Sequence, residues 1–178
     1  AILDTDTDTG TGATGPGPRT TVRPAAPGDL GWILERHAVL YRREFGWGAD
    51  FEASVARIVA GLAADVDDPG QRGWIGEGPA GRLGGVFCAR DDPATARLRL
   101  LLVEPAARGT GLGRDLVDRC VAFARESGYQ RLVLTTQDVC VSARRIYGAA
   151  GFTRVRSTRD ASYDPTGHAE DWTLTIGA

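Results

Sequence analysis

The 178-residue chain contains no lysine, asparagine or methionine, so arginine supplies all 21 of its basic side chains. Without lysine, neither a Schiff base nor a lysine nucleophile is available, and without asparagine there is no N-glycosylation site. The net charge is −2 at pH 7, which argues against a nucleic-acid partner or an anionic membrane surface.

The chain is also poor in cysteine and in long apolar runs. Cys88, Cys120 and Cys140 lack the spacing of a metal or redox motif, and Asp4–Asp8 lacks the turn glycine of a calcium loop, so no metal site is expected. No apolar run approaches the ~20 residues that span a bilayer, and the N-terminus has no signal-peptide pattern. We therefore expect a reduced, cytoplasmic protein that does not enter a membrane.

Composition divides the chain into two parts. Residues 1–19 are repeats of Asp, Thr, Gly and Pro with little to bury, which predicts a disordered low-complexity tail. Residues 20–178 have the composition and length of one globular domain.

The most informative stretch runs from Leu98 to Gly113. Leu98–Val103 is apolar apart from Arg99, which predicts a strand covered on both faces. Pro105 then turns the chain into a glycine-rich loop, and helical periodicity follows from Leu112 to Ala124. A strand, a glycine loop and a helix in succession present free N–H groups that suit a phosphate, although a simple connecting turn would have the same pattern.

Two common phosphate-binding motifs do not fit this loop. Both the Walker motif and the dinucleotide motif fail at Arg114, where the first requires lysine and the second requires the third glycine.

The pattern that does fit is Arg-x-x-Gly-x-Gly, here Arg108, Gly111 and Gly113, following Val-Glu-Pro. A second segment, Ser142–Phe152, matches A-x-x-x-Y-x-x-x-G-F and places Tyr147 at the tyrosine. Together they resemble the two halves of the signature of the GCN5-related N-acetyltransferases. That resemblance implies an α/β (α+β) fold: a mixed, mostly antiparallel, twisted sheet of about six to seven strands, helices on both faces and splayed central strands.

The resemblance also implies a site for acetyl-CoA. Its pyrophosphate would lie on Arg108, Gly109, Thr110, Gly111, Leu112, Gly113 and Arg114, and its pantetheine along Leu101, Leu102 and Val103. Cys140, Ala143 and Tyr147 would line the same site, with Cys140 standing where the family often has asparagine. Tyr147 would act as the general acid, although a core aromatic residue would occupy the same position in the pattern.

Acceptor residues are expected on an earlier helix. His37, Tyr41 and Glu44 lie on the stripe that begins with Leu30, Ile33 and Leu34, and Trp47 follows shortly after. Three polar groups on a stripe facing the core favour a substrate cleft, with Glu44 as the candidate general base; a hydrogen-bonded core histidine and a solvated glutamate are the alternative. Because of Glu44 and the aromatic residues, we expect a cationic amine as acceptor.

Residues His37–Phe51 also resemble the acetyltransferase part of bacterial proteins that fuse a MarR-type winged helix to this enzyme, and the likeness extends from about Val22 to Leu174. Too few residues precede Val22 for the winged helix, so its DNA-binding role is not carried over.

Other patterns place the remaining elements. Strands are expected at Thr20–Arg23, Trp74–Glu77, Leu83–Ala89, Arg131–Thr135, from Phe152 and at Asp171–Ile176; helices are expected from Asp29, over Asp50–Val66 and over Val139–Ala149. Asp29 is the expected N-cap of the first helix.

Three functions are consistent with these residues. The first is an enzyme that moves an acetyl group from acetyl-CoA to a primary amine of a small molecule or amino acid, with a homodimer as an arrangement common in the family. The second is a non-catalytic acyl-CoA sensor, and the third is a nicotinamide dinucleotide-binding protein.

Overall fold

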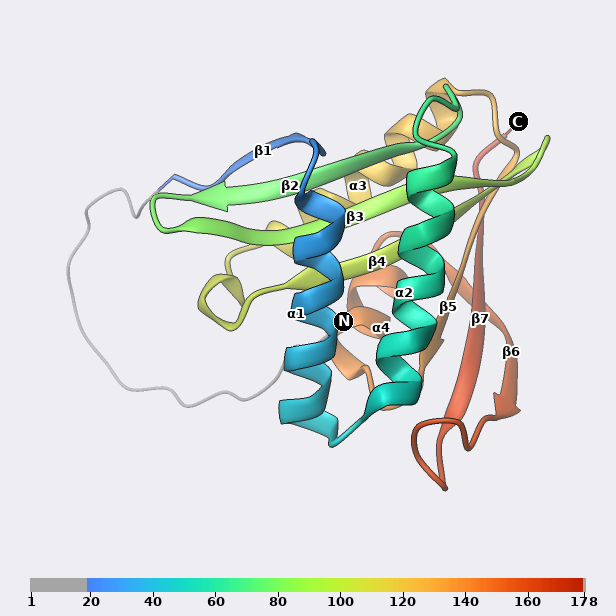
Figure 1. Ribbon diagram of the computed structural model, residues 1–178. Coiled ribbons are helices and arrows are strands. Elements are labelled where there is room, and N and C mark those ends of the chain that lie inside the picture. The colour runs from blue at the N-terminus through green and yellow to red at the C-terminus, as the bar shows by residue number, and fades with distance from the viewer. Residues whose placement is uncertain (1–18, 178) are drawn as a thin grey trace, which may run out of the picture.

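The computed structural model describes residues 19–177, so the predicted tail lies outside the described residues except for Arg19. Within this part the chain forms seven strands, four α-helices and one 3₁₀ helix (Figure 1). In chain order they are β1 (Thr21–Pro24), α1 (Asp29–Phe45), α2 (Ala49–Ala64), β2 (Arg72–Gly78), β3 (Gly81–Asp92), β4 (Thr95–Val103), η1 (Pro105–Ala107), α3 (Leu112–Glu126), β5 (Arg131–Gln137), α4 (Val141–Ala149), β6 (Thr153–Arg159) and β7 (His168–Thr175).

The strands make one sheet in the order β1-β2-β3-β4-β5-β7-β6. Every neighbouring pair is antiparallel except β4 and β5, which are parallel. Helices α1 and α2 cover one face, whereas α3 and α4 cover the other (Figure 1). This arrangement confirms the predicted α+β fold with a mixed, mostly antiparallel sheet.

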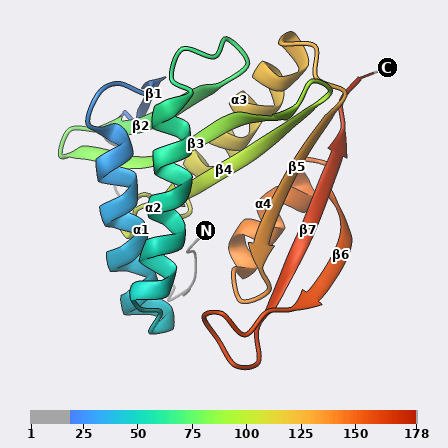
Figure 2. The ribbon, with the colours of Figure 1, turned by 45° about the vertical axis from the view of Figure 1, so that its right-hand side comes forward.

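The two central strands separate soon after they meet. Strand β4 pairs with β5 only through Thr95–Arg97 and Arg131–Val133, and beyond that point the two strands diverge (Figure 2). On its other side β4 contains a bulge, because Leu100 and Leu101 together lie opposite Val86 of β3. Leu100 adopts a left-handed φ of 56°, which is costly for a residue with a side chain. The predicted splay of the central strands is confirmed.

Helix α3 packs as its periodicity predicts. The apolar stripe is buried against β2, β3 and β4 and consists of Leu112, Leu116, Val117, Cys120, Phe123 and Ala124. Gly128 ends the helix with a left-handed φ of 80°, and the next N–H, that of Tyr129, donates to the Ala124 carbonyl. The glycine loop is thereby held between a buried strand and a buried helix.

Several predicted boundaries are wrong for physical reasons. Gly28, with a φ of 96°, is the N-cap of α1, because the Asp29 carboxylate turns back to the Ala26 N–H and the Arg23 and Arg82 guanidinium groups. Helix α2 ends at Ala64 among aspartates, which leaves Val66 exposed. Helix α4 begins at Val141 rather than Val139, and β7 begins at His168 because its pairing with β5 and β6 starts there. None of the helices in residues 19–177 is both long and apolar enough to cross a membrane.

Candidate active site

The glycine loop leaves a run of amide groups free. Gly109 and Gly111 adopt left-handed φ values of 73° and 88°, and Gly111 caps α3. Among residues 19–177, no main-chain carbonyl accepts a hydrogen bond from the N–H groups of residues 109–114. Successive free amides at a helix N-terminus attract phosphate oxygens, so the loop has the geometry of an anion site.

Gly113 has a packing role rather than a conformational one. A Cβ atom there would lie 2.8 Å from Ile146 Cδ1 of α4, so the missing side chain allows α3 and α4 to approach each other. Thr110 closes the loop by donating from Oγ1 to the Ala107 carbonyl at 2.6 Å. Arg114 points away from the core and pairs with Asp118 of the same helix at 2.8 Å.

Arg108 joins the loop to the end of helix α1. Its Nη2 atom donates to a Glu44 carboxylate oxygen across 64 residues of sequence. Its Nε atom is buried and makes no hydrogen bond among the described residues. A buried donor without an acceptor is costly, and a phosphate oxygen at the loop would satisfy it.

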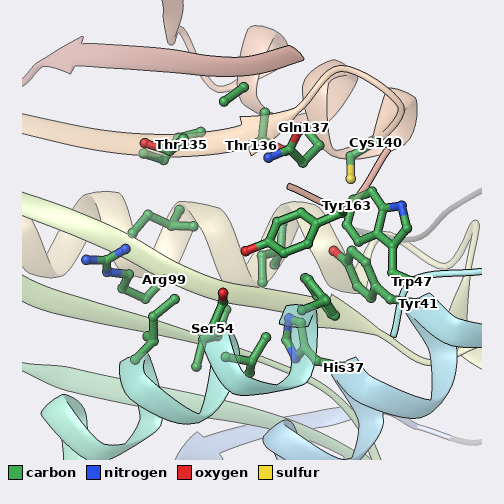
Figure 3. Close-up of a pocket in the computed structure, with 18 of the residues that line it drawn as sticks. His37, Tyr41, Trp47, Ser54, Arg99, Thr135, Thr136, Gln137, Cys140 and Tyr163 are labelled. Atoms are coloured by element: carbon green, nitrogen blue, oxygen red, sulfur yellow. The ribbon is translucent and has the colours of Figure 1, made fainter. Parts of the chain in front are cut away.

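A cavity of about 310 Å³ lies on the α1–α2 side of the diverging strands. Its walls come from α1, α2 and the turn between them, β4, β5, Cys140 just before α4, Tyr147 within α4, the segment between β6 and β7, and the start of β7 (Figure 3). Leu98, Arg99, Leu100 and Leu101 of β4 all line it. The bulge explains how four consecutive residues can do so, since side chains of a regular strand alternate between faces.

Two tyrosines and a cysteine form one end of this cavity. Tyr41, Cys140 and Tyr147 line it and are almost fully buried. Burial, and then the fields of Cys140 and Cys120, raise the pKa of Tyr147 above its ordinary value. Burial, followed by the field of Cys140, raises the pKa of Tyr41 well above its ordinary value. Both phenols therefore carry their protons at neutral pH and can act as hydrogen-bond donors.

His37 lies in the same wall and is stacked on Tyr41, with ring centroids 5.5 Å apart. Its Nδ1 atom is 2.9 Å from the Ile33 carbonyl, so Nδ1 carries the hydrogen and Nε2 keeps a lone pair. Burial lowers the pKa of His37 to about 3, which keeps the ring neutral. Trp47 and Phe51 pack around Tyr41 and against Tyr163 of the β6–β7 segment.

The cavity unites some of the predicted site residues and leaves others outside. His37, Tyr41, Trp47, Leu101, Cys140 and Tyr147 line it. Leu102, Val103 and Ala143 are buried in the core beside it, and Glu44 is not among the lining residues. The Glu44 carboxylate lies at the glycine loop with Arg108, so the expected polar stripe divides between two places.

The charged groups of the cavity were not among the predicted site residues. Arg99 and Asp160 both line it, together with the polar residues Ser54, Thr135, Thr136, Gln137 and Tyr163. Hydrogen bonds from Ser162, and then one from Gln137, lower the pKa of Asp160. The sequence could have identified Arg99 as a site residue, because it is the one polar residue within the apolar run Leu98–Val103. No sequence pattern marks Asp160, since it lies on a connection between strands.

The sheet with its splayed strands, the free amide loop and the cavity beside it together have the architecture of an acyl-CoA-dependent transferase. The model of the acetyltransferase (GNAT) family matches residues 34–152, well over half of the chain, and the chain belongs to that family. The predicted family resemblance is confirmed.

Solved structures show the same fold. The chain resembles yncA of Salmonella typhimurium, described as an acetyltransferase with its cofactor acetyl-CoA, with a TM-score of 0.72 and 20% identity over 90% of this chain and 95% of that one. It also resembles a GNAT-family acetyltransferase of Staphylococcus aureus, with a TM-score of 0.71 and 17% identity over 89% of this chain and 99% of that one.

Curated relatives match shorter parts. N-acetylaspartate synthetase of Danio rerio is 35% identical over 82 residues, which are 45% of this chain and 29% of that protein. Mycothiol acetyltransferase of Beutenbergia cavernae is 35% identical over 79 residues, which are 44% of this chain and 27% of that protein. The chain thus spans less than a third of the length of these two relatives.

Proposed function

We propose that the protein transfers an acetyl group from acetyl-CoA to a primary amine of a small molecule or amino acid. The observation that carries this proposal is the pairing of a free-amide loop with an acceptor cavity across the splayed strands. Acetyl-CoA supplies the activated acetyl thioester. The chain supplies the binding groups, the orientation and the protons.

The loop residues are suited to hold the pyrophosphate. Six successive N–H groups at residues 109–114 are free of main-chain acceptors within the described part of the chain, and the Arg108 Nε atom is buried nearby without an acceptor. Free amides at a helix N-terminus and an arginine are the donors that phosphate oxygens accept from. Substitution of Gly111 or loss of Arg108 should therefore act on cofactor affinity.

Strand β4 is suited to hold the pantetheine. Beyond Arg97 its edge toward β5 has no strand partner, which leaves the main chain of Leu101, Leu102 and Val103 open to a ladder with the amide groups of the cofactor. An N–H of the bulge would polarise the thioester carbonyl and stabilise the oxyanion, and one such donor contributes about 3–4 kcal/mol in acyl transfer.

Tyr147 is the proposed general acid for the departing thiolate. It lines the cavity beside Cys140 and keeps its proton at neutral pH. It also packs on Phe152 and Trp172, at centroid distances of 5.9 and 6.4 Å, which holds its ring in one orientation. Tyr147 can therefore be both an aromatic residue of the core and a proton donor to the site.

Glu44 fits the role of general base less well than its sequence position indicates. Its carboxylate is paired with Arg108 and is not part of the cavity wall. A base must lie within hydrogen-bond reach of the proton that it takes, directly or through one water. The proposed mechanism therefore lets the amine lose its proton to solvent and assigns no step to Glu44.

The test is release of free CoA thiol with a panel of amines, together with calorimetry of CoA binding. We expect CoA binding and thiol release with at least one amine. Tyr147→Phe should lower kcat tenfold or more, on the order of general acid catalysis. Tyr129→Phe is the matched control, because that buried hydroxyl donates to the Gly70 carbonyl outside the cavity.

Other results would support other functions. CoA binding without turnover on any amine would favour the acyl-CoA sensor, and stabilisation by NAD instead of CoA would favour a dinucleotide-binding protein. An unchanged kcat in Tyr147→Phe would remove Tyr147 from the acid role. The MarR-fusion likeness, the homodimer and the cytoplasmic location stay predictions, since membership of the family does not decide among them.

A further inference from the structure

The charge of Arg99 is unusual in having no partner. Its guanidinium lines the cavity, is half-buried, and makes no hydrogen bond or ion pair within residues 19–177. Burial lowers the pKa of Arg99, yet an arginine remains charged at neutral pH. A partly buried cation without a counter-ion is unfavourable, which makes the cavity ready to receive an anion.

Arg99 also lines a second cavity with Asp65 and Asp68, but it makes no ion pair with either, and Asp68 is paired with Arg90. Asp91, whose field acts on Arg99, is held by Arg97 through two hydrogen bonds of 3.0 Å. Thr135 donates to Asp171 at 2.7 Å, and Ser54 donates to the Asp50 carbonyl at 3.0 Å. Asp91, Thr135 and Ser54 are thus already engaged, whereas the Arg99 donors are not.

The cavity also has two chemically different ends. Arg99 lies at one end, whereas Tyr41 and Cys140 lie at the other, with Tyr163 and Ser54 between them (Figure 3). Asp160 is the one carboxylate among the lining residues, and its oxygens accept hydrogen bonds from Gln137 and Ser162. An acceptor that lies along this cavity meets acyl-transfer groups at one end and a free cation at the other.

We propose that Arg99 binds a carboxylate of the acetyl acceptor, so that the acceptor is an amino carboxylic acid rather than a simple cationic amine. The planar guanidinium matches a carboxylate with two parallel hydrogen bonds, and a monoanion neutralises its single charge. This inference rests on the proposed acetyl transfer. It replaces the cationic acceptor expected from Glu44, which the structure places outside the cavity wall.

The test compares substrates with and without the carboxylate: leucine with isoamylamine and phenylalanine with phenethylamine, in which acid and amine share one carbon, and 6-aminohexanoate with pentylamine, in which the amine can extend to the far end of the cavity. Thiol release gives kcat/KM for each. We expect the amino acid to be preferred about 10- to 100-fold, the range for a hydrogen bond to a charged group. Equal kcat/KM within each pair would overturn the proposal.

Two variants test whether Arg99 causes the preference for substrates with a carboxylate. Arg99→Met, which keeps an unbranched chain but no charge, should raise KM for the amino acids and leave kcat/KM for the amines within about threefold. Arg119→Met is the matched control, because Arg119 is exposed on α3, pairs with Asp115 of the same helix and is not part of the cavity wall. An Arg99→Met enzyme that still prefers amino acids would contradict the assignment.

A binding measurement separates this proposal from the proposed function. N-acetyl-leucine and N-acetyl-isoamylamine are titrated calorimetrically into the wild type, Arg99→Met and Arg119→Met. We expect only the acid to bind, and only when Arg99 is present, whether or not the chain turns over an amine. Absence of thiol release with every amine would refute acetyl transfer, whereas equal binding of the acid to wild type and Arg99→Met would refute the carboxylate site.

Discussion

His37 should make the stability of the protein depend on pH in a measurable way. The ring is 4% exposed, and its Nδ1–H donates to the Ile33 carbonyl within α1. Burial lowers its pKa from 6.5 to about 3, so the folded protein holds the ring neutral where the unfolded chain would protonate it. The perturbation that tests this is His37→Asn, whose amide can still donate to the Ile33 carbonyl but does not titrate.

The direction and the size of this pH dependence follow from the difference in proton binding between the folded and unfolded states. Between pH 3 and 6.5 the unfolded chain binds more protons at His37 than the folded protein, so the free energy of unfolding rises with pH in this window. Above pH 6.5 the contribution of the neutral ring is complete, and below it the contribution is lost progressively. At pH 5, about 1.5 units below the unfolded pKa, the loss amounts to about 2 kcal/mol.

Urea denaturation of the wild type and His37→Asn at pH 8 and pH 5 measures this difference. We expect the free energy of unfolding of the wild type to fall by about 2 kcal/mol more than that of the variant. His168→Asn is the control for removal of a histidine, because the His168 side chain is 45% exposed. A difference between wild type and His37→Asn that stays constant from pH 8 to pH 5 would refute the reasoning.

Two further substitutions test the loop and the predicted base. Gly111→Ala places a side chain at a φ of 88°, so it should lower the free energy of unfolding in urea by about 1–2 kcal/mol and weaken CoA binding in calorimetry. The control is Gly61→Ala on the exposed face of α2, which should stabilise the protein by up to about 1 kcal/mol. A stable Gly111→Ala would show that the loop does not need the left-handed conformation. Glu44→Gln should keep kcat within about threefold in the thiol assay, because its carboxylate is bonded to Arg108, and a hundredfold loss would restore Glu44 as the base.

Patterns that extend over only a few residues were sufficient to predict much of the fold. The strand, loop and helix from Leu98 to Glu126 follow from an apolar run, a left-handed glycine cap and a 3.6-residue stripe, each of which acts over a few residues. The β2–β3 hairpin follows from Gly78 and Gly81 in the same way.

The structure departs from the sequence expectation where a distant residue binds a side chain. Asp29 has the sequence of an N-cap, but Arg23 and Arg82 from β1 and β3 bind its carboxylate. Glu44 shares the helix face of His37 and Tyr41, but Arg108 pairs with it at the glycine loop. Spacing along a helix identifies the face, whereas the partner on that face depends on how strands far away in sequence come together.

The bulge in β4 links the two halves of the site. A regular strand would point Leu98 and Leu100 to one face and Arg99 and Leu101 to the other, whereas here all four line one cavity. The left-handed Leu100 costs about 1–2 kcal/mol, so packing of the surrounding core must hold it in place. Because the residue before it carries the proposed carboxylate anchor and the residue after it begins the open edge for the cofactor, one strained position sets the distance between donor and acceptor. We therefore expect that straightening the bulge would disturb both proposed sites together.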